Sequence, residues 1–287
     1  MANKKILNQI SLMMYGFGDS DQPDPATVEL VESIVKSQLR SIVNEALKYN
    51  SGPVLKGESL VFLLRHNKYK MQRFVRYLKT RQITAKCGAV NSPVVEVVEG
   101  PKNNKLLDFV RFLDETGEFL DISEVDETKL NRMLRADQIS KSISKEKYME
   151  YQQARIASFK KIQSANSFKS WVDPQNEIEF DKDAMDVLSY LAFQTVAEIV
   201  DYAFFVRADV KSVIDPFETI AGTSCTTSIF KPHGAAGPGS APSKVFPYQV
   251  PIRVHEVQEV MRRVHNPQAG KLNFGGPMPE THFLLAL

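Results

Sequence analysis

The sequence has few of the residues that support covalent chemistry or crosslinking. It contains two cysteines in 287 residues, Cys87 and Cys225, and each lies in a stretch of small residues without a second metal ligand beside it. We therefore expect no disulfide framework and no zinc cluster. The five histidines show no metal-ligand spacing, and Gly16-Phe17-Gly18 lacks the lysine of a phosphate loop. These absences argue against an enzyme, a cofactor and a small-molecule substrate.

Long apolar runs and charge of one sign are also missing. The longest fully apolar runs, such as residues 60–64, have five residues, which is too short to span a bilayer, so no membrane is expected as a partner. Asn8 and Gln9 interrupt the apolar stretch near the N-terminus, which differs from a signal peptide. A net charge of +2 argues against a dedicated nucleic-acid packager. The expectation is an intracellular soluble protein, with 43% hydrophobic residues to build its core.

The charge is nevertheless uneven along the chain. No acidic residue lies between Arg65 and Val95, and eight basic residues fall within a helix-like stretch at 65–86 that also carries aromatic residues. Such a helix could contact DNA phosphates weakly and without sequence preference, or it could be a solvated face whose apolar stripe covers the core. Both interpretations stay open. The candidate DNA contacts are Lys68, Lys70, Arg73, Arg76, Lys79 and Arg81.

The first 81 residues predict a characteristic order of elements. A short helix at 6–14 ends at the glycines that follow it, and Asp24-Pro25 then begins a long helix that runs to about residue 49. Apolar residues recur every three or four positions along this long helix. Val54-Leu55 is long enough only for a two-residue extended piece, and a short helix and the basic helix follow it.

The same order returns in the last third of the chain. Apolar residues between 159 and 172 predict a short helix, and Asp181 or Asp183 can cap a long helix that is apolar over more than half its circumference. We expect other elements to enclose this helix on several sides. Residues 250–252 are the expected second extended piece, and a short helix follows them.

These patterns divide the chain into four parts. We expect a first unit with its basic helix at 1–81, a connector at 82–157 with a helix near 105–117, a second unit at 158–266, and a tail at 267–287. A Gly/Pro-rich loop is expected at 219–247 within the second unit.

Neither repeated unit can enclose a core alone, because each long helix has apolar surface on too many sides. Two such units can cover each other by crossing their long helices and pairing each extended piece with the opposite unit. This arrangement is the histone-fold handshake. The predicted fold class is therefore all-α, with two histone folds that pair within one chain.

Four segments resemble the two-histone-fold subunit of the SAGA transcription coactivator, of the suppressor-of-Ty family. They are residues 11–19, 58–65, 114–120 and 188–201. The resemblance covers residues 10–211 and 248–265 and implies a nuclear, non-enzymatic subunit that contacts the TATA-box-binding protein and neighbouring histone-fold subunits. Because that partner is basic, an acidic patch on the second long helix is a candidate docking face. Its residues are Glu198, Asp201 and Asp209. Binding of DNA by the helix at 65–86 is the alternative function.

Overall fold

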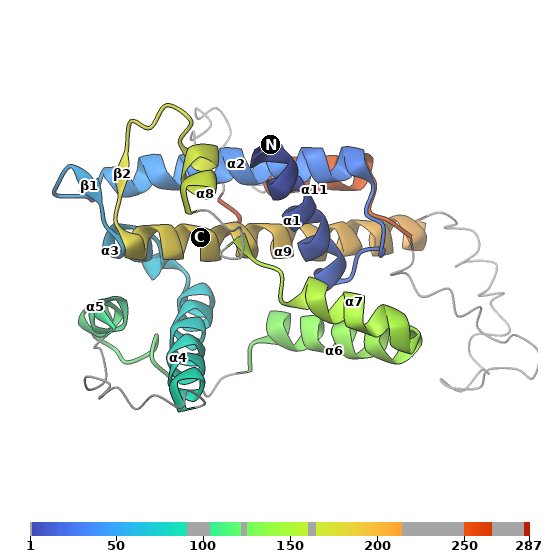
Figure 1. The fold of residues 1–287 in the computed structure, drawn as a ribbon, viewed down its shortest axis with the longest axis horizontal. Coiled ribbons are helices and arrows are strands. Elements are labelled where there is room, and N and C mark those ends of the chain that lie inside the picture. The colour runs from blue at the N-terminus through green and yellow to red at the C-terminus, as the bar shows by residue number, and fades with distance from the viewer. Residues whose placement is uncertain (1, 91–103, 122–124, 160–164, 214–249, 266–283) are drawn as a thin grey trace, which may run out of the picture.

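The computed structural model describes residues 2–90, 104–121, 125–159, 165–213, 250–265 and 284–287. In these ranges all regular secondary structure is helical apart from two strands of two residues each, so the predicted all-α class is confirmed. Figure 1 shows α2 (Pro25–Leu47) and α9 (Lys182–Val213) side by side, with the middle helices below them. The loop predicted at 219–247 lies outside the described residues.

α1 (Ala2–Phe17) ends where the chain turns into a left-handed conformation. Gly18 has a φ of 115°, which an L side chain rarely adopts. The N–H groups of Gly18 and Asp19 donate hydrogen bonds of 3.0 Å to the carbonyls of Tyr15 and Met14. These bonds use carbonyls that the helix end would otherwise leave unpaired, as the glycines in this stretch predict.

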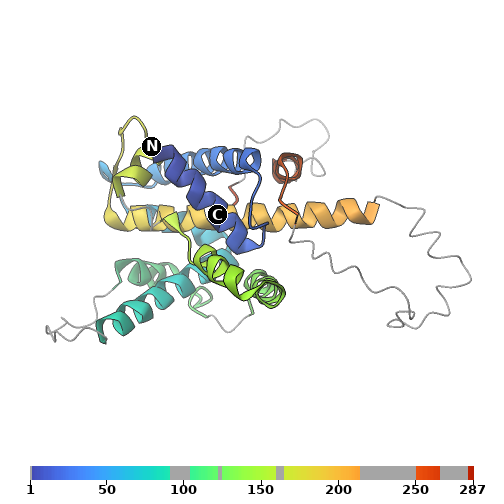
Figure 2. The same ribbon diagram turned by 45° about the vertical axis from the view of Figure 1, so that its right-hand side comes forward.

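α2 begins at the predicted position. Pro25 is its first residue, and the Asp24 carboxylate accepts hydrogen bonds from the Ala26 N–H and the Thr27 hydroxyl. Figure 2 shows α1 lying obliquely across α2 and α9, and it contacts both. The first two helices of the chain are therefore packed against a helix from its last third.

Other elements enclose α9 on several sides, as its apolar circumference predicts. It contacts α1, α2, α3 (Gly57–Leu63) and α11 (Val254–His265). Burial of such a surface stabilises a fold by about 25 cal/mol per Å² of apolar area. Its fully buried residues include Leu188, Leu191, Ala192, Val196, Ile199 and Ala203.

A small parallel sheet joins the segment after α2 to the segment before α9. β1 (Val54–Leu55) pairs with β2 (Glu179–Phe180), with Val54 opposite Glu179. The prediction placed the second extended piece at 250–252, and this assignment was wrong, because no strand forms there and the strand lies before α9 instead. Residues 250–252 still contact the opposite part of the chain, since the Ile252 N–H donates a 2.8 Å hydrogen bond to Asp19.

The middle of the chain is more helical than predicted. The helix expected near 105–117 is α5 (Lys105–Leu113), but two further helices follow it, α6 (Glu127–Ser142) and α7 (Lys145–Arg155). α7 packs closely on α1. The sequence gives little indication of α6 and α7, because each helix buries only two residues. These are Ala136 and Ile139 in α6, and Tyr151 and Ala154 in α7.

α4 (Lys68–Val90) follows a single 3-10 turn at Leu64–His66. Its predicted apolar stripe is buried at Met71, Phe74, Val75 and Leu78. Residues 284–287 of the predicted tail belong to the hydrophobic core, where the Leu285 N–H donates to the Gln38 side chain at 2.9 Å. None of the described helices is both long enough and apolar enough to cross a membrane.

Candidate functional site

The basic residues of α4 and the acidic residues of α9 face each other. The Lys70 ammonium lies 3.5 Å from the Glu198 carboxylate, and an Arg73 nitrogen lies 3.9 Å from the same carboxylate. Arg73 also makes two hydrogen bonds, of 2.8 and 3.0 Å, to Asp126. Lys70 and Arg73 were predicted to contact DNA, and Glu198 was predicted to contact a protein partner. In the structure these residues neutralise each other inside one site.

Asp201 lies one turn further along α9 and is paired with α6. Its carboxylate is 2.6 Å from Arg132 and 2.8 Å from Arg135. Asp201 is 8% exposed and Glu198 is 7% exposed, so neither is a freely solvated acid. Breaking a buried pair of this kind is strongly destabilising, because it leaves an uncompensated charge.

Burial and neighbouring charge act in opposite directions on these groups. Burial lowers the pKa of Lys70, although the charge of Glu198 opposes this shift, and burial raises the pKa of Glu198 against the pull of Lys70 and Arg132. Burial also raises the pKa of Asp126, but its bonds to Arg73 outweigh that effect and hold its pKa below the usual value. Arg73 and Asp126 therefore form the strongly ionised pair of the site, whereas Lys70 and Glu198 are costly to keep charged.

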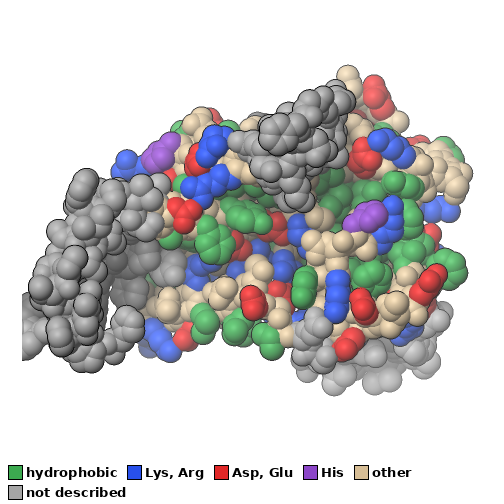
Figure 3. Space-filling view, turned by 180° about the vertical axis from the view of Figure 1, so that it is seen from behind, with side chains coloured by type: hydrophobic (Ala, Val, Ile, Leu, Met, Phe, Trp, Pro, Cys, Tyr) green, Lys and Arg blue, Asp and Glu red, His purple; other side chains and the backbone are tan. Residues whose placement is uncertain are grey.

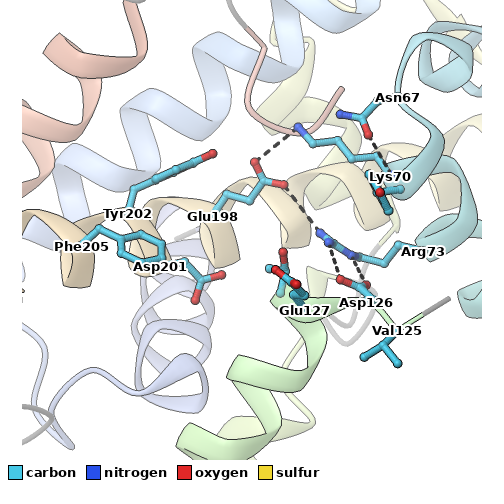
Figure 4. A pocket seen from close by; sticks show the side chains of 12 residues that line it. Asn67, Lys70, Arg73, Val125, Asp126, Glu127, Glu198, Asp201, Tyr202 and Phe205 are labelled. Carbon is cyan, nitrogen blue, oxygen red and sulfur yellow. Dashed lines mark hydrogen bonds and ion pairs between the residues drawn. The ribbon is translucent and has the colours of Figure 1, made fainter.

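These residues line a pocket of about 630 Å³ between α4, α9 and the start of α6. Figure 4 shows Lys70 and Arg73 reaching from α4 toward Glu198, with Tyr202 and Phe205 on the same stretch of α9. Four acidic residues and two basic residues line the pocket. The acids are Asp126, Glu127, Glu198 and Asp201, and the bases are Lys70 and Arg73.

Exposed apolar and aromatic side chains surround the charged centre. Tyr69 is 58% exposed, Val125 69% and Phe205 61%, and all three line the pocket. Figure 3 shows the face opposite to that of Figure 1, where hydrophobic side chains gather among charged side chains of both signs. Exposed aromatic residues next to a desolvated charge cluster are typical of protein-binding surfaces.

The remaining predicted residues lie away from the pocket. Asp209 is exposed near the end of α9 and pairs with Arg263 of α11. Arg81 pairs with Asp186 at 2.6 Å. Lys68, Arg76 and Lys79 are half-buried residues of α4 that do not line this pocket.

Sequence reasoning missed several members of the site. Asp126, Arg132, Arg135 and Tyr202 were not predicted, although one signal was available. Glu198 and Asp201 lie three positions apart and are the only charged residues of α9 between Asp186 and Arg207, and buried carboxylates of this kind require cationic partners. No group of His, Cys, Asp or Glu suited to a metal ion occurs among the described residues.

Comparison with known proteins identifies the family. The family described as the 18 kD subunit of transcription initiation factor IID, a histone-fold family, matches residues 4–89. The SAGA complex subunit Spt3 of Drosophila melanogaster is 30% identical over 284 residues, which cover 93% of this chain and 69% of the relative. The chain belongs to the Spt3 family of SAGA complex subunits.

Two fungal relatives support this assignment. Spt3 of Schizosaccharomyces pombe is 25% identical over 90% of this chain and 89% of the relative. SPT3 of Saccharomyces cerevisiae is 24% identical over 72% of this chain and 75% of the relative. The Spt3 family consists of non-enzymatic subunits of a transcription coactivator, so the predicted family and the predicted lack of enzymatic activity are confirmed.

Proposed function

We propose that this Spt3-family chain is a nuclear scaffold of a SAGA-like coactivator that binds and recruits the TATA-box-binding protein. The 630 Å³ pocket carries the proposal, because the exposed acid Glu127 and the exposed aromatic residues in its lining complement a basic partner. Recruitment needs no covalent chemistry. Holding the partner near a promoter raises its effective concentration there.

The individual residues of the pocket have different parts in this proposal. Glu198 and Asp201 are largely buried and already paired with cations, so they hold α4 and α6 against α9 rather than contacting the partner directly. Glu127 is exposed at the pocket and can meet a cation of the partner directly. Tyr69 and Phe205 would be the anchors, because aromatic side chains contribute most where they become fully buried in an interface.

The experiment measures binding of the purified TATA-box-binding protein to the full chain by biolayer interferometry. Tyr69→Ala combined with Phe205→Ala should weaken binding at least tenfold. Phe112→Ala is the matched control, since Phe112 is 81% exposed on α5 and does not line the pocket. Equal binding by the double variant and the wild type would overturn this docking site.

Charge is tested at exposed positions only. Reversal of Asp201 would leave Arg132 and Arg135 unpaired and could unfold the chain, so a loss of binding would be ambiguous. Glu127→Lys and Asp209→Lys alter exposed acids instead. Glu127 lines the pocket, and Asp209 is the exposed member of the predicted acidic face. We expect Glu127→Lys to slow association and to reduce its dependence on salt.

We also propose that the two histone folds pair within the chain and that other histone-fold subunits of the complex are neighbours. The contacts of α9 with α2 and α3 and the pairing of β1 with β2 support this proposal. Residues 1–157 and 158–287, produced separately, should each aggregate and should become soluble when they are co-expressed. A half that folds cooperatively as a monomer would contradict intramolecular pairing.

Weak DNA binding by α4 remains the alternative prediction. Lys70, Arg73 and Arg81 each pair with a carboxylate, which reduces the charge that α4 can offer to phosphates. A duplex of random sequence should bind at low salt and dissociate at physiological salt if the alternative holds. No binding at low salt would eliminate it.

A further inference from the structure

A second groove lies next to the pocket and has the opposite charge. It has a volume of about 430 Å³ and is formed by α4, α6, α9 and the residues that follow α7. Arg73 lines both hollows and, with Asp126 and Asp201, lies near the boundary between them. No acidic residue lines this groove, but five cationic residues do. They are Arg73, Arg76, Lys129, Arg132 and Arg155.

The cations of the groove differ in how far carboxylates already satisfy them. Arg73 and Arg132 are paired with Asp126 and Asp201. Lys129 and Arg155 are exposed, and neither forms an ion pair with another described residue. Positive charge therefore dominates at the groove.

One donor in the wall of the groove is unused. Arg132 donates from Nε to Asp201 and from Nη1 to Gln194, but its Nη2 is buried and has no hydrogen-bond partner among the described residues. A buried donor without a partner costs about 1–3 kcal/mol. A carboxylate bound in the groove could offset part of that cost after a small movement of the guanidinium.

The floor of the groove is apolar and aromatic. Tyr190 is buried, and its ring centroid lies 4.7 Å from that of Tyr77 and 5.1 Å from that of Phe74. Ile156 is 56% exposed beside this floor, and Phe193 also lines the groove. A ligand that offers charge alone would leave these apolar surfaces in contact with water.

We propose that this groove docks an acidic peptide segment of a partner protein in which carboxylates alternate with apolar side chains. The carboxylates would meet Lys129, Arg155 and Arg132, and the apolar side chains would cover Ile156 and the aromatic floor. The phosphates of a nucleic acid would match the positive charge of the groove. They would fit its apolar floor less well than a peptide, because they lie on a regular backbone that offers no apolar side chains. The proposal does not depend on binding of the TATA-box-binding protein in the neighbouring pocket.

The experiment uses the full chain and fluorescence anisotropy. The probe is a fluorescein-labelled synthetic peptide of twelve residues in which Asp and Glu alternate with Leu and Phe. A second peptide, in which Asn and Gln replace the acids, measures binding that does not depend on charge. We expect the acidic peptide to bind at least tenfold more tightly than the neutral one, and equal binding would overturn the proposal.

Variants locate the binding site. Lys129→Glu combined with Arg155→Glu should weaken binding of the acidic peptide at least tenfold, and Ile156→Ala should weaken it severalfold. Arg111→Glu combined with Lys141→Glu is the matched control, because it reverses two exposed cations that do not line the groove. If both double variants weaken binding equally, the effect is one of net charge and the proposal is wrong.

Competition distinguishes a peptide site from a phosphate site. Unlabelled duplex DNA at physiological salt should not displace the acidic peptide. Displacement by DNA at lower concentration than by unlabelled peptide would assign the groove to nucleic acid and overturn the proposal. Binding of the TATA-box-binding protein by the Lys129/Arg155 variant should be unchanged, which separates failure of this proposal from failure of the proposed function.

Discussion

The carboxylate of Asp19 accepts a 2.8 Å hydrogen bond from the backbone N–H of Ile252, which lies 233 residues further along the chain. The same oxygen accepts a second 2.8 Å bond from the Ser20 N–H. Asp19 is only 2% exposed, and burial raises its pKa to about 6, although both amides and the charge of Arg207 act in the other direction. The contact between the segment after α1 and the segment before α11 therefore depends on the protonation of one buried carboxyl group.

The contribution of Asp19 to the free energy of unfolding should therefore fall as the pH rises from about 4 to about 6. In this range the folded chain retains a proton on Asp19 that the unfolded chain has released, so protonation favours the folded state. The loss should be about 3 kcal/mol for a shift from 3.8 to about 6. Asp19→Asn removes the titration, and urea unfolding of both proteins at several pH values measures the difference. Parallel pH profiles would contradict this prediction.

Gly16 should not tolerate a side chain. A Cβ at this position would lie 2.6 Å from the backbone oxygen of Ala154, so α1 and α7 would have to separate. Gly16→Ala should destabilise the chain by about 1–3 kcal/mol. Gly52→Ala is the matched control, because a Cβ there meets no atom within 4 Å. Thermal unfolding of the two variants measures the contrast, and an equally stable Gly16→Ala variant would show that α7 does not pack as described.

Asp201 should matter far more for stability than Asp209. Asp201→Ala leaves Arg132 and Arg135 without their buried carboxylate and should cost about 3–5 kcal/mol. Asp209→Ala removes a pair on the surface and should have little effect. Urea unfolding gives both values. Equal effects would indicate that α6 is not held to α9 through Asp201.

Trp171 should report directly on the docking of α8 (Ala165–Val172) against α2. It is the single tryptophan, it is 5% exposed, and its indole N–H donates to the Glu32 carboxylate. Glu32→Ala should shift the emission to longer wavelength and cost about 1.5–3 kcal/mol, since the bond has a charged acceptor. Glu29→Ala, an exposed neighbour on the same helix, should change neither quantity.

The parts of the fold that the sequence predicts are those with strong local signals. Asp24-Pro25 marks the start of α2, and Gly18 marks the end of α1. β2 was missed because two residues, Glu179 and Phe180, carry no periodic pattern. α6 and α7 were missed because their stability comes from contacts of both helices with α1 and from the ion pairs of α6 with Asp201 of α9, rather than from a wide apolar stripe of their own.

The candidate site was predictable only in part. The sequence indicates the basic character of Lys70 and Arg73 and the acidic character of Glu198 and Asp201, but it does not indicate that they face each other. Arg132 and Asp201 are 69 residues apart, so only the tertiary structure brings them together. Whether Glu198, Asp201 and Asp209 take part in docking stays a prediction.

The pairing of β1 with β2 has a consequence for synthesis of the protein in the cell. Ribosomes add roughly 5–20 residues per second, so Leu55 waits on the order of ten seconds for Phe180 to emerge. During that interval the apolar face of α2 has no α9 to cover it. The nascent chain therefore exposes an aggregation-prone apolar surface for much of its translation. Chaperones, or a subunit that binds during translation, would have to protect it from aggregation.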